Sequence, residues 1–282
     1  MTRATDADSV PNVPEIAHPP PHRPTDYATL IARATAAPAV LGLVLKGSHA
    51  HEGMVTEHSD HDVYAIVSDE REAALAGLED CRTADLDLVV TTVEGFRRLD
   101  GLERYGIARG RVLLDRLDGE IASIVAAKGR LETAEASRAA AGWLDAYANS
   151  HYRSVKNARD GHPLAAHLDA GDSIGFLLEF LFALDRRPRP YNKYLTWELD
   201  RFPLPRWNAP ELLATIGRIT AQGDTDLQRR LFSQVEAVAR EAGHGPTLDD
   251  WGEDLHLMRP PPAPMTWKRG DTTCTEAGCT PF

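Results

Sequence analysis

A group of acidic side chains after a buried strand is the part of the sequence best suited to chemistry. The apolar run 40–45 is soon followed by Gly47 and Ser48, and Asp60 and Asp62 come after a polar segment. Because the side chains of a strand alternate between its faces, Asp60 and Asp62 project from the same face. Neighbouring carboxylates repel each other, and a cation between them keeps both ionised.

A second acidic pair opens the strand expected over residues 85–91. Asp85 and Asp87 share a face of this strand. Asp87 lies deeper, directly before an apolar run, so we favour it as the third carboxylate, with Asp85 as the alternative. Such hard oxygen ligands suit Mg²⁺. Gly47 lets a ligand approach the backbone, and free N–H groups of a helix starting after Ser48 would face a phosphate. The pattern predicts a site for a triphosphate and magnesium.

These motifs resemble the DNA polymerase β-like nucleotidyltransferase superfamily. The resemblance is carried by Gly47-Ser48, by the piece Ser59-Asp60-His61-Asp62, by Val63 after the second aspartate and by the later strand aspartate, over about residues 38–92. A small sheet domain followed by a helical domain is also the layout of the aminoglycoside (antibiotic) nucleotidyltransferases, to which the chain is similar.

The resemblance implies transfer of a nucleoside monophosphate from a nucleoside triphosphate, by preference AMP from ATP, with release of pyrophosphate. Asp60 and Asp62 would bridge two Mg²⁺ ions. Asp87 would hold the ion nearer the acceptor or accept the proton of the acceptor hydroxyl. Gly47 and Ser48 would contact the triphosphate. The family implies a small hydroxylated acceptor.

The chain departs from the family pattern in a histidine-rich segment, where family members more often have glycine and small residues. Structural zinc sites usually need tighter, cysteine-containing spacing. We therefore interpret these histidines as substrate contacts or as exposed residues; they are His49, His51, His58 and His61.

Residues 186–199 combine cations and aromatic rings after an apolar helix. Lys193 is our first choice for gripping the triphosphate and Arg189 the second. Tyr191 or Trp197 could stack on the base. The alternative for both cations is a solvated turn between helices.

Other polar groups in the second half receive structural interpretations. Tyr152, Arg153 and Lys156 have the spacing of a solvated helix face. Glu179 is an acid within an apolar helix, where it would be costly unless paired, so we expect a structural ion pair.

Composition limits the choice of partners. The 282 residues include 31 Lys and Arg against 42 Asp and Glu, a net charge of −11. Such a chain lacks general attraction to nucleic acid, whereas a cationic acceptor such as an aminoglycoside suits it. Without an apolar stretch of 18 residues, a secretory signal or a cysteine framework, we expect a cytoplasmic protein that does not enter membranes. The sequence leaves the oligomeric state open.

The pattern of elements changes once along the chain. We expect an α+β fold: a loose leader over 1–24, a mixed-sheet catalytic domain over 25–118, a helical domain over 119–258 and a loose tail over 259–282. Strands are predicted at 40–45, 61–67, 85–91 and 111–114, and first-half helices at 27–36, 69–79 and 93–100. Later helices are predicted at 119–134, 136–159, 172–185, 208–221, 225–242 and 247–257.

Two other functions remain open on the sequence alone. One is a protein-modifying enzyme of the toxin–antitoxin type, which transfers AMP to a partner; the fused helical half is unlike the minimal forms of such enzymes. The other is a nucleotide-binding regulator without turnover, against which the three intact aspartates Asp60, Asp62 and Asp87 argue.

Overall fold

A computed structural model describes residues 26–262, which fall into two compact units. The sheet unit contains the described residues up to Glu132 together with Arg186–Leu195. The helical unit contains Thr133–Asp185 and the described residues from Thr196 onward. The chain therefore leaves the sheet unit once and returns to it for ten residues, which we call the strap (residues 186–195). The expected leader and residues 263–282 of the expected tail lie outside the described residues.

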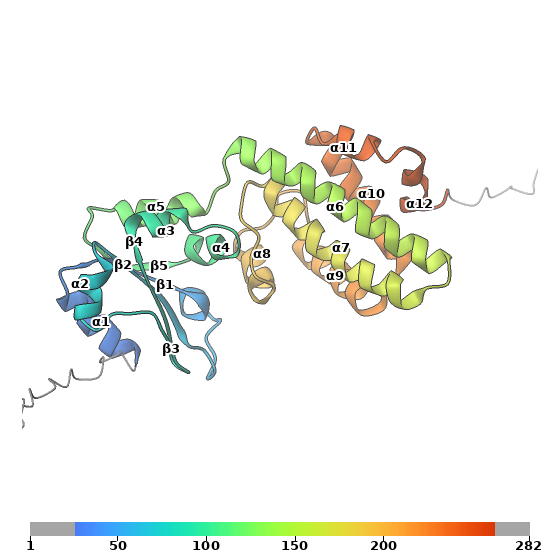
Figure 1. Ribbon diagram of the computed structural model, residues 1–282. Coiled ribbons are helices and arrows are strands. Elements are labelled where there is room, and N and C mark those ends of the chain that lie inside the picture. Colours follow the sequence, from blue (N-terminus) through green and yellow to red (C-terminus); the bar gives the residue numbers. More distant parts are fainter. Residues whose placement is uncertain (1–25, 263–282) are drawn as a thin grey trace, which may run out of the picture. The chain divides into compact units, whose positions relative to one another are not determined.

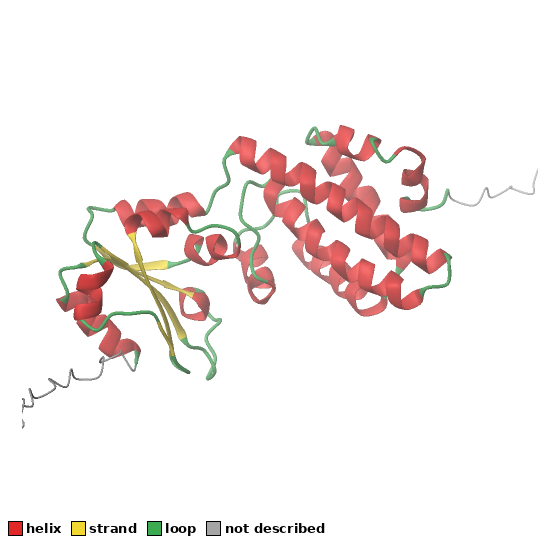
Figure 2. Ribbon diagram, in the orientation of Figure 1, coloured by secondary structure: helices red, strands yellow, loops and turns green. Residues whose placement is uncertain are grey.

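The sheet has five strands in the order β3-β4-β2-β1-β5. Its central pair, β1 and β2, is antiparallel, and β2 is parallel to β4. Both edge strands, β3 and β5, are antiparallel to their neighbours. Figure 2 shows these strands crossing as one twisted layer. The strands are β1 (Val40–Lys46), β2 (His61–Val67), β3 (Cys81–Arg82), β4 (Leu86–Thr92) and β5 (Arg111–Asp115).

Each face of the sheet is covered by helices (Figure 1). On one face, Leu43 and Val63 pack with Leu30 of α1 (Tyr27–Ala36), and α2 (Glu70–Leu75) lies on the same side. On the other face, Val44 and Tyr64 pack under the remaining helices of the unit. These helices are α3 (Val93–Arg98), α4 (Leu102–Ala108) and α5 (Glu120–Lys128). Burying each large apolar side chain contributes about 1.5–3 kcal/mol, so the two layers fix the sheet between them.

Helix α1 begins at the residue expected from the sequence. Asp26 caps it, and its carboxylate accepts hydrogen bonds from the backbone N–H and the hydroxyl of Thr29, both at 2.9 Å. Such a cap satisfies N–H groups that have no partner in the first helical turn.

The division between the units differs from the expected boundary near residue 118. Helix α5 packs on the sheet through Ile121, Ile124 and Val125, so it belongs to the first unit. Its spacing resembles that of the helices that follow, and only its contacts with the sheet distinguish it.

The helical unit is built on an antiparallel pair of long helices, α6 (Thr133–Arg159) and α7 (Pro163–Leu184). The expected central core helix is present: Leu177, Phe180 and Phe182 are almost fully buried in α7. It begins at Pro163 rather than near 172, because the proline occupies the first turn, where no N–H partner is lost. The other helices are α8 (Leu195–Arg201), α9 (Ala209–Gln222), α10 (Thr225–Glu241), α11 (Gly245–Asp249) and α12 (Leu255–Met258).

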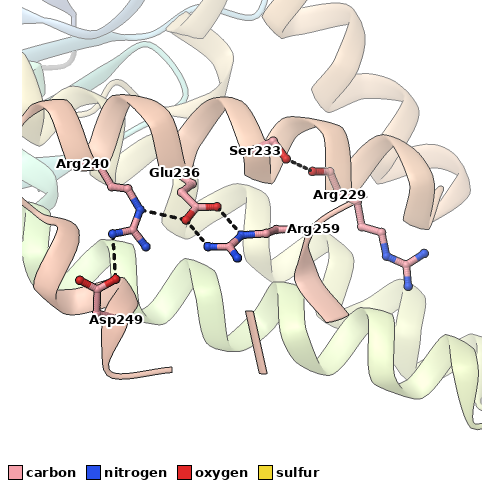
Figure 3. A network of polar contacts seen from close by, with 6 residues as sticks. All are labelled: Arg229, Ser233, Glu236, Arg240, Asp249 and Arg259. Carbon is pink, nitrogen blue, oxygen red and sulfur yellow. Dashed lines mark hydrogen bonds and ion pairs between the residues drawn. The ribbon is translucent and has the colours of Figure 1, made fainter. Parts of the chain in front are cut away.

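A network of charged side chains fastens the last described helices to α10 (Figure 3). Glu236 accepts hydrogen bonds from Arg240 at 2.9 Å and from Arg259 at 2.6 and 2.8 Å. Arg240 also pairs with Asp249 at 2.8 Å. The hydrogen bonds from Arg259 and Arg240 outweigh burial and lower the pKa of Glu236.

No helix in residues 26–262 combines the length and apolar character needed to cross a membrane.

Candidate functional site

The turn after β1 approaches β2 very closely. Gly47 has a φ of +67°, a conformation that side-chain-bearing residues rarely adopt, and it opens the short 3-10 helix η1 (Gly47–Ala50). A methyl group added to Gly47 would overlap Oδ2 of Asp62. The sequence analysis expected Gly47 to let a ligand approach the backbone. In the structure the carboxylate of Asp62 makes such a close approach.

The expected carboxylates come together on neighbouring strands. Asp62 of β2 lies opposite Asp87 of β4 in the parallel register. Adjacent strands lie about 4.8 Å apart, and side chains in this register point to the same face. Asp60 directly precedes β2 and is close enough to Asp62 to affect its titration. The alternative third carboxylate, Asp85, precedes β4 and is exposed.

Negative charge accumulates around Asp62. Burial raises the pKa of its carboxyl group, and the charges of Asp60, Asp87 and Glu103 raise it further, whereas Lys46 lowers it. A cation bound beside Asp62 would relieve this repulsion.

The carboxylates do not form a closed metal cage. Within residues 26–262, no group of three or more His, Cys, Asp or Glu side chains is arranged to hold a metal ion as it stands. Asp87 points one oxygen toward Arg82, with Oδ2 3.9 Å from Nε. These carboxylates still suit Mg²⁺. This ion is usually bound by one or two carboxylates, with waters and substrate phosphates as its other ligands, rather than by protein groups alone.

A partly buried trio of Lys46, Tyr64 and Glu103 beside Asp62 was not anticipated from the sequence. Lys46 faces Asp62 across the β1–β2 ladder. Its Nζ donates to Oε2 of Glu103 at 2.9 Å, and the hydroxyl of Tyr64 donates to the same oxygen at 2.7 Å. Burial acts to raise the pKa of Glu103, but these two hydrogen bonds outweigh it and lower the pKa. The sequence held one indication of this trio: Lys46 is a charged residue at the end of an otherwise apolar strand.

The strap brings Lys193 to the turn that holds Ser48. The Nζ of Lys193 donates to Oγ of Ser48 at 2.7 Å, and the hydroxyl of Tyr194 lies 3.4 Å from the same oxygen. Ser48 is buried, whereas Lys193 is exposed. Two residues proposed from distant parts of the sequence, 145 positions apart, are thus in direct contact.

Arg189, the second candidate cation, has a different partner. Its guanidinium donates to Oδ1 of Asn192 at 2.6 Å within the strap. This contact gives the strap internal order. This hydrogen bond does not connect Arg189 to Ser48 or to the carboxylates, so the role of Arg189 as a triphosphate ligand stays a prediction.

The two aromatic candidates for base stacking lie in different units. Tyr191 of the strap donates from its hydroxyl to the carbonyl of Leu102 at 2.6 Å. Burial, together with the charges of Glu103 and Asp62, raises the pKa of Tyr191 to about 12. Trp197 belongs to the helical unit, where the guanidinium of Arg201 lies 4.6 Å from its ring centre.

The histidines of the polar segment have several environments. His49 stacks on His61 with ring centres 3.8 Å apart, and His61 stacks on Tyr27 at 4.1 Å. His51 is 1% exposed, so the interpretation of this histidine as a substrate contact or an exposed residue is wrong: its ring fills the core beneath the turn. His58 is exposed.

The polar groups singled out in the second half make contacts inside the helical unit. Arg153 pairs with the buried Asp169 at 3.1 Å, and Lys156 lies over the ring of Tyr152 at 5.6 Å. Glu179 is half-buried on α7. These contacts agree with a structural role for the Tyr152–Lys156 cluster.

A comparison with models of known protein families matched none of them, and a comparison with curated proteins found no significant relative.

Proposed function

We propose that the protein is a magnesium-dependent nucleotidyltransferase, with the sheet unit as its catalytic domain and the helical unit as an accessory domain. It would transfer AMP from ATP to a hydroxyl of a small cationic acceptor, of which aminoglycosides are an example. The observation that carries this proposal is the contact of Lys193 with Ser48, at 2.7 Å, in the unit that also sets Asp62 opposite Asp87.

The roles follow from the chemistry of each side chain. Asp60, Asp62 and Asp87 would hold Mg²⁺, which would neutralise charge on the phosphates and the attacking oxygen. The ammonium of Lys193 and the hydroxyl of Ser48 would hold the triphosphate by charge-assisted hydrogen bonds. Gly47 would let the backbone approach it.

The reaction forms a bond between the acceptor oxygen and the α-phosphorus. The bond from the α-phosphorus to the oxygen that bridges it to the β-phosphorus breaks, and pyrophosphate leaves with that electron pair. The acceptor hydroxyl proton passes to Asp87 or to water. Because Lys46 is already held by Glu103 at 2.9 Å, it would act as a fixed counter-charge to the carboxylates rather than as a triphosphate ligand.

The net charge of −11 favours a cationic acceptor. Carboxylates attract such a molecule and disfavour anionic competitors. An acceptor with several hydroxyl and amino groups would meet both requirements of the proposed site, a nucleophilic oxygen and positive charge.

The test is pyrophosphate release from each of the four ribonucleoside triphosphates with Mg²⁺. A panel of aminoglycosides and other hydroxylated amines would serve as acceptors, and mass spectrometry would follow both acceptor and protein. Asp62→Asn, which keeps the side-chain shape beside Gly47, is the matched control. We expect acceptor-dependent release with the nucleotide mass on the small molecule, and none from the variant. Nucleotide mass on protein would instead indicate the protein-modifying alternative, and equal activity of Asp62→Asn would refute the site.

A further inference from the structure

His51 lies at the centre of contacts that join the turn after β1 to the strap. Its Nδ1 is 2.7 Å from the carbonyl oxygen of Gly47, and its Nε2 is 3.2 Å from the hydroxyl of Tyr105. A carbonyl can only accept, so Nδ1 carries the hydrogen, and in the neutral ring Nε2 accepts from Tyr105. Both ring nitrogens are therefore satisfied inside the protein.

The face of the same ring packs against the strap. His51 stacks on Tyr194 with ring centres 4.0 Å apart and planes inclined by 7°. Tyr194 is buried, and the next residue along the strap toward the N-terminus is Lys193. Two contacts therefore join the same two short segments. His51 stacks on Tyr194, and Ser48, three residues before His51, accepts a hydrogen bond from Lys193, which directly precedes Tyr194.

The other ring stack of the segment does not include the strap. His61 stacks on both His49 and Tyr27, and these contacts join the turn to β2 and α1. The strap contacts the turn through the stack of Tyr194 on His51, and through Ser48, whose Oγ lies 2.7 Å from Nζ of Lys193 and 3.4 Å from the hydroxyl of Tyr194.

We propose that His51 is a positioning residue: it holds the strap against the turn so that Lys193 and Ser48 stay together as one triphosphate-binding pair. This inference rests on the proposed function for its consequence in catalysis. Its structural part, the anchoring of Lys193 by the His51–Tyr194 stack, does not depend on that function.

Two substitutions separate the roles of the histidine ring. His51→Phe keeps a flat ring to stack on Tyr194 but loses both hydrogen bonds. His51→Asn can keep a donor for the carbonyl of Gly47 but loses the ring. His58→Ala changes an exposed histidine of the same segment that has no contact with the strap, and it is the matched control.

The first measurement is the rate at which an amine-reactive acetylating reagent labels Lys193, read by mass spectrometry. Lys156, exposed on α6, serves as the internal reference. The bond to Ser48 should slow the labelling of Lys193 in the native protein. We expect His51→Asn to increase the relative labelling severalfold, and His51→Phe to increase it less. Unfolding curves followed by circular dichroism would show that both variants fold.

The second measurement is steady-state kinetics. The KM for the nucleotide should rise about tenfold in His51→Asn with little change in kcat, because a charge-assisted contact to the triphosphate is misplaced. Rescue by His51→Phe should be partial.

Each outcome bears on one part of the proposal. Unchanged labelling in folded His51→Asn would overturn the anchoring role whatever the protein catalyses. Increased labelling with an unchanged nucleotide KM would overturn the role in triphosphate binding. A native protein that binds no nucleoside triphosphate would refute the proposed function, while the labelling result would still decide whether His51 anchors the strap.

Discussion

Gly47 lies against the carboxylate of Asp62 so closely that the glycine has no room for a side chain. Gly47 directly follows β1, and Asp62 lies near the start of β2, the antiparallel neighbour of β1. This contact sets the separation between the turn that carries Ser48 and the strand that carries the acidic pair. The glycine that we propose to lie against the triphosphate thus also packs against a carboxylate of the same site.

The first prediction concerns this contact. Gly47→Ala should destabilise the protein by about 2–4 kcal/mol, through the positive φ and through the overlap with Asp62, and should abolish any nucleotide binding. Gly53→Ala is a matched control because Gly53 has a φ of +78° in the same segment but open space around it. Thermal unfolding should show a smaller loss for Gly53→Ala, with binding retained. Equal losses for the two variants would mean that backbone strain alone accounts for the effect.

The second prediction concerns the charge beside Asp62. Removing the cation in Lys46→Met should raise the pKa of Asp62 further, since burial and the neighbouring carboxylates already raise it. Protonation of Asp62 competes with Mg²⁺, so the acid limb of a pH–rate profile should move to higher pH by about one unit. Tyr64→Phe leaves the charges unchanged and should leave that limb in place. A limb that stays fixed in Lys46→Met would show that Asp62 is not the titrating group.

Part of this site could be predicted from the sequence because it depends on local rules. Strand alternation predicted that Asp60 and Asp62 share a face, and the apolar run after Asp87 favoured it over Asp85. In the structure Asp62 lies opposite Asp87, while Asp60 directly precedes β2. The four longer strands were predicted within one or two residues of their observed ends, since buried strands give continuous apolar runs. The two-residue strand β3 and the short helix α4 carry too few residues for a periodic signal.

The remainder depends on contacts between distant segments. Lys193 and Ser48 were each proposed as triphosphate ligands, but their contact was not predicted, because nothing local places a segment 145 residues away beside that turn. The trio of Lys46, Tyr64 and Glu103 requires the register of β1 with β2 and the docking of α4. His51 was misinterpreted because a histidine among glycine, acidic and other polar residues usually lies in solvent, whereas its ring here packs with Tyr105 and Tyr194, which come from two distant parts of the sequence.

The third prediction is a pH dependence of stability from the helical unit. His151 is fully buried, its Nε2 is 2.9 Å from the carbonyl of Met258, and burial lowers its pKa to about 4. The unfolded chain takes up this proton near the ordinary histidine pKa of about 6.5. Stability from the neutral ring is thus complete above about pH 6.5 and is lost as the pH falls toward 4, by up to roughly 3 kcal/mol. Urea unfolding between pH 4 and 8 measures it. In His151→Phe the fall in the free energy of unfolding between pH 6.5 and 4 should be smaller by this amount. An unchanged pH dependence would show that other groups cause it.

The fourth prediction concerns the network in Figure 3. Glu236→Ala removes the carboxylate that holds both Arg240 and Arg259, and it should cost about 1–3 kcal/mol because Glu236 is only 12% exposed in its side chain. Arg218→Ala breaks a pair with Asp224 in which the arginine is 58% exposed, and it should cost less than about 1 kcal/mol. Chemical denaturation measures both. Similar costs for the two variants would indicate that the Glu236 network is no more than a set of surface pairs.

The fifth prediction separates the two cations of the strap. Lys193→Ala should raise the KM for the nucleoside triphosphate about tenfold, because the ammonium that touches Ser48 at 2.7 Å is removed from the proposed phosphate site. Arg189→Ala should change that KM by less than about twofold, since its guanidinium is bonded to Asn192 within the strap. Titration of a non-hydrolysable triphosphate analogue by calorimetry measures both variants independently of turnover. A larger loss in Arg189→Ala than in Lys193→Ala would reverse the assignment and would imply that the strap rearranges when the nucleotide binds.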